Sequence, residues 1–158
     1  LVKYVNEALS EQKKKQQSPG EDDKSILYND LDTESSDIDK EYEINKQVFQ
    51  KLDSLIRRDE LYLSADLSRE DLVRMAHMNN TRFAKMIKEN TGTNLSGYIN
   101  ELRLNHAIHL LKEHPEYTLR AIAEASGINS MPTFHSLFKN KTGMTPSEFK
   151  KTQMDMKQ

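Results

Sequence analysis

The feature that most constrains the fold is an internal repeat in the second half of the chain. Residues 77–99 and 127–151 carry the same order of turn, apolar and capping residues, so that Phe83 corresponds to Phe134, an offset of 51. Upstream of the turn the offset becomes 50, which gives the second copy one extra turn residue. Each copy has the pattern of a short helix, a tight turn and a longer helix. The repeat therefore predicts two lobes built on one helix-turn-helix plan.

The segment between the copies, residues 95–114, predicts one long helix with two apolar stripes. A helix that is apolar first on one side and then on the other is shared between two lobes. At 100° per residue the first stripe lies roughly opposite the second. The first stripe contains Leu95, Tyr98, Ile99 and Leu102, and the second contains Leu104, Ala107, Ile108 and Leu111.

Capping signals mark the remaining helices of an all-α fold. Ser68 with Asp71, and Thr145 with Glu148, form the spacing of a capping box, and Pro146 suits a first helical position. No segment alternates as a strand does. We therefore predict two helix-turn-helix lobes, homeodomain-like repeats, joined by a long linker helix. The expected boundaries are 44–94 for lobe one, 95–114 for the linker helix, 115–151 for lobe two and 152–158 for a tail.

Residues 1–43 differ in composition from the rest of the chain. Residues 18–43 hold ten acidic residues against Lys24 and Lys40, and the whole chain has a mean hydropathy of −0.82. Such a segment buries too little apolar area to offset the entropy of ordering it, so we predict a largely disordered acidic tether. The alternative is an acidic peptide that docks on the chain through Ile26, Leu27, Tyr28 and Leu31. A chain that begins at Leu1 is also expected to be a fragment of a longer protein.

Charge separates along the chain. Residues 1–63 carry 10 Lys and Arg against 15 Asp and Glu, a net −5, whereas residues 64–158 carry 13 against 10, a net +3. The second part therefore suits an anionic partner. The chain has no cysteine, which excludes disulfides and thiolate chemistry, and it has no apolar run long enough to span a bilayer.

Catalysis and metal binding are not expected. No nucleophile, base and orienting acid share a motif, so we predict that the chain is not an enzyme and needs no cofactor. Histidines invite a metal interpretation, but zinc needs a third and a fourth ligand in fixed geometry, and we predict no metal. The residues concerned are His106, His109, Glu113 and His114.

The repeat instead predicts double-stranded DNA binding. The second helix of a helix-turn-helix enters the major groove with its outward residues on base edges. A 19-residue spacer is roughly 28 Å long, which with the helix radii matches the roughly 34 Å between successive grooves. The base-reading candidates are Thr81, Arg82, Ala84, Lys85, Pro132, Thr133, His135 and Ser136. The phosphate-contacting candidates are Asn79, Lys88, Ser130, Lys139, Lys141, Lys150 and Lys151.

Two further positions and one helix carry expectations. His77 replaces glycine at the turn of the first copy, where a left-handed backbone is expected. Arg103 is expected to form a structural ion pair with Glu124 or Glu148. The second reading helix lacks an outward arginine, which favours phosphate contacts and DNA shape over direct base contacts in lobe two.

Residues 45–151 carry an ordered set of motifs. These are Arg103-Leu104, Ile122-Ala123, Gly127-Ile128, Phe134 with Phe138-Lys139, and Gly143 with Thr145-Pro146 and Phe149. The set closely resembles the AraC family of bacterial transcriptional regulators. The stretch "LYLSADLSREDLVRMAHMNNTRF" resembles more narrowly the variants in Bacteroidetes-type membrane-linked sensor regulators.

The resemblance implies a sequence-specific DNA-binding output domain that contacts RNA polymerase. It also implies a cytoplasmic domain, an upstream sensor outside this sequence that can be anchored in the inner membrane, and a full-length protein that can form a homodimer. The alternative function is a protein-docking module whose basic face is covered by the acidic linker.

Overall fold

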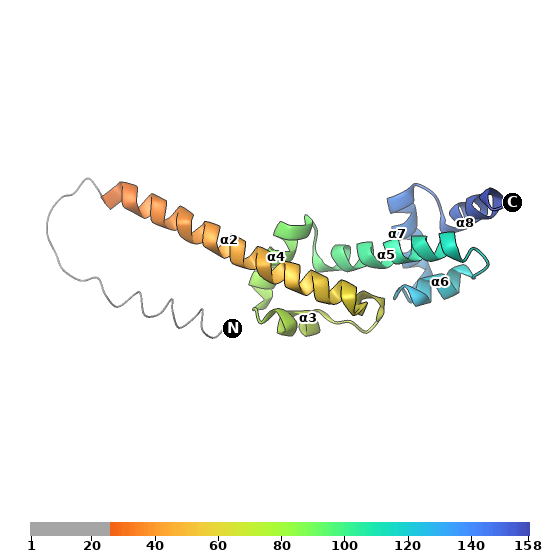
Figure 1. Ribbon diagram of the computed structural model, residues 1–158, viewed down its shortest axis with the longest axis horizontal. Helices are drawn as coiled ribbons and strands as arrows, with labels where there is room; N and C mark the ends of the chain where they lie inside the picture. Colours follow the sequence, from red (N-terminus) through yellow and green to blue (C-terminus); the bar gives the residue numbers. More distant parts are fainter. Residues whose placement is uncertain (1–25) are drawn as a thin grey trace. The chain divides into compact units, whose positions relative to one another are not determined.

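A computed structural model describes the backbone of residues 26–158 and the side chains from Ser36 onward. The chain divides into two units, residues 1–46 and residues 47–158. The described residues form helices and no strand, which confirms the predicted all-α class (Figure 1). The helices are α2 (Ile26–Arg58), α3 (Arg69–Ala76), α4 (Asn80–Thr91), α5 (Leu95–Glu113), α6 (Leu119–Ala125), α7 (Met131–Thr142) and α8 (Pro146–Met156), with a 3-10 turn η2 (Leu61–Leu63) after α2.

Helix α2 begins before the predicted start of lobe one. Residues 26–43, expected to be a disordered linker, lie in α2, which begins 18 positions before the expected start at Ile44. Burial in a core is not needed for this helix to form, because a helix that already has a packed end lengthens by one backbone hydrogen bond per residue. Lys40 adds an ion pair with Asp37 at 3.6 Å. The predictions for residues 1–25 lie outside the described residues, as do the side chains through which the acidic peptide was expected to dock.

The described residues form two separate hydrophobic cores, one in each of the predicted lobes. Helix α5 belongs to both, because its buried residues change sides along its length as the two-stripe pattern predicts. Tyr98, Ile99 and Leu102 enter the first core, which also contains Leu52, Ile56, Leu72, Ala76, Phe83, Met86 and Ile87. Leu104, Ala107 and Leu111 enter the second core, which also contains Ile122, Ala123, Ile128, Phe134 and Phe138.

Local signals set most helix ends. The capping boxes at Ser68 and Thr145 both form. His77 ends α3 in the left-handed conformation at φ 52°, as expected for the turn. Helix α8 continues to Met156, past the expected domain end at residue 151.

The capping boxes make the helices sensitive to acid. Ser68 donates from Oγ to Asp71 Oδ2 at 2.7 Å, and Thr145 N donates to Glu148 Oε2 at 2.8 Å. These hydrogen bonds lower the pKa of Asp71 and of Glu148 below their usual values. Because the pKa of each carboxyl is lower in the folded state, its stabilisation is complete above the unfolded pKa of about 4. That stabilisation is lost as the pH falls through the folded pKa.

We therefore expect the free energy of unfolding to fall as the pH drops below about 4. Chemical unfolding between neutral and acidic pH measures it. The double variant Asp71→Asn, Glu148→Gln should show a shallower fall than the wild-type chain. An identical slope in the two proteins would contradict this assignment.

Candidate nucleic-acid interface

Three buried side chains set the rotation of α4. Phe83, Met86 and Ile87 lie in the first core, so the opposite side of the helix faces solvent. Of the predicted base-reading residues on this helix, Arg82 is half-buried and the other three are exposed, as the spacing predicts. The exposed three are Thr81, Ala84 and Lys85. Lys85 Nζ lies 3.9 Å from the Glu89 carboxylate one turn on.

Helix α7 repeats this arrangement in lobe two. Phe134 and Phe138 are buried with their rings edge to face at 5.7 Å. Pro132, Thr133 and Ser136 are exposed. The prediction for His135 is only partly met, because its ring is half-buried and lies edge-on to Phe134, 6.3 Å between centroids. The surface of α7 is therefore polar and carries fewer charged side chains than that of α4.

The two predicted N-cap residues do cap their helices. Asn79 Oδ1 accepts from Arg82 N at 2.8 Å, and Ser130 Oγ accepts from Thr133 N at 3.4 Å. Thr133 Oγ1 also donates to Ser130 Oγ at 3.0 Å. Both residues are exposed, so α4 and α7, the two predicted reading helices, present their N-termini to solvent. Backbone N–H groups there favour an anion.

The predicted phosphate lysines differ in their surroundings. Three of them already bind the protein: Lys88 Nζ donates to Gly92 O at 2.9 Å, Lys150 Nζ to Tyr117 O at 2.6 Å, and Lys141 pairs with Glu101 of α5. Lys139 and Lys151 are exposed. A phosphate would have to compete for the first three lysines, so Lys139 is the best placed of the set on a reading helix.

Sequence analysis missed two residues of these surfaces. Glu89 and Asn140 are exposed one turn beyond Lys85 and Ser136, on the same sides of α4 and α7. The offset of 51 relates them to each other, and the four-residue spacing would have found both. Asn140 adds the amide donor and acceptor that the outward surface of α7 otherwise lacks.

Helix α5 positions the two reading helices. In Figure 1, α4 and α7 both run across the direction of α5, at separate places along it. Contacts join α5 to α4 in lobe one and to α6, α7 and α8 in lobe two. A single 19-residue helix thus anchors both lobes.

Arg103 has a structural role, but the predicted partners are wrong. Its Nε donates to Tyr62 O at 2.6 Å, and its NH2 group donates to Ser64 O at 2.8 Å. Glu124 lies 3.9 Å from Arg120, and Glu148 caps α8. The carbonyls after α2 came within reach through the tertiary fold, and no local pattern marks them.

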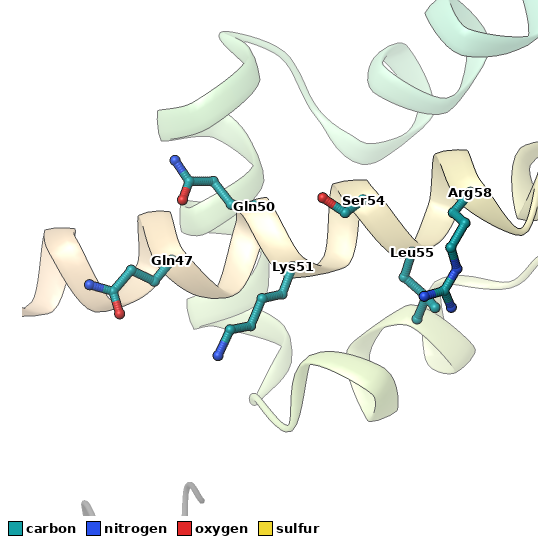
Figure 2. Close-up of a pocket in the computed structure, with 6 residues that line it drawn as sticks. All are labelled: Gln47, Gln50, Lys51, Ser54, Leu55 and Arg58. Atoms are coloured by element: carbon teal, nitrogen blue, oxygen red, sulfur yellow. The ribbon is translucent and has the colours of Figure 1, made fainter.

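Among the described residues, a further surface feature lies on α2. Figure 2 shows six side chains around a shallow depression, and all of them project from one helix, α2. They are Gln47, Gln50, Lys51, Ser54, Leu55 and Arg58. In the part of the chain that the structure describes, no three His, Asp or Glu side chains are grouped to hold a metal ion. Within the same residues no helix has the length and hydrophobicity for crossing a membrane.

Two helix-turn-helix units on one shared helix, each exposing the outward side of its second helix, define a bipartite helix-turn-helix domain. Residues 72–152 match the family described as a helix-turn-helix domain. The chain belongs to the AraC family of such domains.

Known regulators and solved domains agree with this assignment. The uncharacterized transcriptional regulatory protein YesN of Bacillus subtilis is 39% identical over 80 residues, which are 50% of this chain and 22% of YesN. The regulator YobQ of the same organism is 31% identical over 91 residues, 58% of this chain and 37% of YobQ. The chain thus spans well under half of either relative.

Two solved structures share the fold. An AraC-type transcriptional regulator from Chromobacterium violaceum has a TM-score of 0.59 at 27% identity, covering 68% of this chain and 93% of the other. The C-terminal domain of the response regulator YesN from Fusobacterium nucleatum has a TM-score of 0.59 at 22% identity, covering 66% and 98%.

Proposed function

We propose that this chain is the sequence-specific, double-stranded-DNA-binding output domain of a signal-responsive bacterial transcription regulator. In this proposal α4 and α7 enter adjacent segments of the major groove. One observation carries this proposal: the two lobes bury equivalent sides of α4 and α7 and leave equivalent sides exposed. AraC-family membership of the chain supports the same function.

The two lobes would contribute differently to DNA binding. Helix α4 exposes Lys85 next to Ala84, which suits a base edge and a thymine methyl. Helix α7 exposes Pro132, Thr133 and Ser136, which suit phosphate contacts and DNA shape. Lobe one would therefore supply most of the direct base contacts.

Further partners follow from the family and remain proposals. The relatives are much longer than the matched region, which supports an upstream sensor that controls this domain. We propose that the whole regulator contacts RNA polymerase, acts in the cytoplasm and can form a homodimer. Its membrane anchoring, and the Bacteroidetes-type variant, stay predictions from the resemblance.

Two lysine variants test the proposal. Duplexes selected by the wild-type chain from a random library provide the probe. Lys85→Ala should re-rank the selected sites and cost about 1–3 kcal/mol on the best one, because a base contact is lost. Lys139→Ala should weaken all duplexes alike and reduce the slope of log K against log salt by about 1, because one phosphate contact is lost.

Lys112→Ala is the matched control, since this exposed lysine lies on α5 outside both reading helices. It should leave the ranking and the slope nearly unchanged. Equal affinity of the wild-type chain for selected and random duplexes would contradict sequence-specific binding.

A further inference from the structure

The turn after α2 is held by the shared helix. Arg103 of α5 donates to two backbone carbonyls of this turn, Tyr62 O at 2.6 Å and Ser64 O at 2.8 Å. The ring of His106, one turn further along α5, lies edge-on to the Tyr62 ring at 6.2 Å. Burial lowers the pKa of His106, which is consistent with an uncharged ring at this contact. The turn after α2 is thereby fixed to α5.

The helix-turn-helix turn of lobe two meets the same turn after α2 and shares one of its carbonyls, Tyr62 O. A Cβ atom on Gly127 would lie 2.8 Å from Tyr62 O, 2.9 Å from Leu63 O and 2.9 Å from Arg103 Nε. Two of these three atoms are backbone, so they cannot rotate away as a side chain does. The helix-turn-helix turn of lobe two therefore packs directly against lobe one, and the Arg103 guanidinium lies beside this contact.

The repeat shows why this position is a glycine. His77 occupies the equivalent turn in lobe one and adopts the same left-handed conformation, φ 52° against 79° at Gly127. A side chain is thus compatible with the backbone of this turn. What excludes a side chain at Gly127 is the close approach of lobe one, because His77 is exposed whereas Gly127 is buried.

We propose that Arg103 and Gly127 form a joint between the lobes that selects the spacing between the two DNA half-sites. This inference rests on the proposed function, because it concerns how α4 and α7 are placed relative to each other on one duplex. Helix α5 alone can bend gently, as long helices do, and a second contact between the lobes removes that freedom. Arg103 and Gly127 are positioning residues in this proposal and do not contact DNA.

The experiment compares spacing preference with single-site affinity. The probes are the duplex selected by the wild-type chain, the same duplex with one base pair inserted between half-sites, and a duplex with only the lobe-one half-site. One base pair moves the second site by about 3.4 Å and about 34°. We expect the wild-type chain to favour the selected spacing by about tenfold, and Arg103→Met by about twofold or less.

Two further variants separate positioning from other roles. Arg103→Lys keeps the charge but lacks the planar group that donates to both carbonyls, so its spacing preference should fall while its salt slope stays unchanged. Gly127→Ala should lower the same preference, whereas Gly143→Ala should not, since Gly143 is left-handed at φ 77° with nothing within 4 Å of its Cβ position. If Gly127→Ala fails to fold, the two Arg103 variants decide the question.

The outcomes are distinct. Reduced spacing preference with unchanged lobe-one half-site affinity supports the joint. Spacing preferences equal to wild type in Arg103→Met and Arg103→Lys would overturn it. A uniform loss on all three duplexes would also overturn it, because that result assigns Arg103 to DNA contact or to folding. A wild-type chain that shows no sequence preference would instead overturn the proposed function.

Discussion

Replacing Phe134 by alanine is expected to lower the free energy of unfolding by about 3–5 kcal/mol. Phe134 is 0% exposed, and its ring packs edge to face on Phe138. Removing it leaves a cavity in a core that contains only one other phenylalanine among its fully buried members. Because a domain of this size is stable by about 5–15 kcal/mol, this single change threatens the folded state.

The loss should be largest in lobe two. The two cores are separate groups of residues that share only helix α5, so a cavity in one core does not remove contacts from the other. Amide hydrogen exchange should show faster exchange in α6 and α7 than in α3 and α4 for Phe134→Ala. Phe83→Ala, at the equivalent position of lobe one, should show the reverse. Equal acceleration in both lobes for each variant would contradict the two-core description.

Replacing Ile56 by alanine should lower the free energy of unfolding by about 2–5 kcal/mol. Ile56 is 0% exposed and belongs to the first core, so this end of α2 is a structural part of lobe one. Ile38 lies on the same helix but is 64% exposed. Ile38→Ala is therefore the matched control, and we expect it to change the free energy of unfolding by less than about 0.5 kcal/mol.

Guanidinium unfolding followed by circular dichroism measures both variants. The contrast tests whether the C-terminal end of α2 is part of lobe one, since a helix that only preceded the domain would tolerate either change equally. A cost at Ile56 no larger than the cost at Ile38 would show that α2 does not contribute to the lobe-one core.

The sequence predicted most of the fold because the decisive information was local. Capping boxes at Ser68 and Thr145 depend on residues three positions apart, and both form as expected. The opposite stripes of α5 depend only on the angle between successive residues, and they predicted two cores. Equivalent positions in a repeat then placed the outward residues of α4 and α7.

The errors arose where the outcome depended on residues distant in the chain. Arg103 was expected to pair with a carboxylate because its partners were sought among charged residues, whereas it binds backbone carbonyls that any residue carries. Composition predicted disorder for residues 26–43, but they continue a helix whose other end is packed. The lysines that bind their own chain, such as Lys150, were likewise indistinguishable from exposed ones.

The sequence by itself thus determined the helices, their buried sides and the duplication, since periodicity and capping act within a few residues along one helix. Only the tertiary structure decided which lysines are already engaged and how the lobes meet at Gly127. Those features depend on backbone carbonyls and charges from separate elements, whose positions are defined only when both lobes pack on α5.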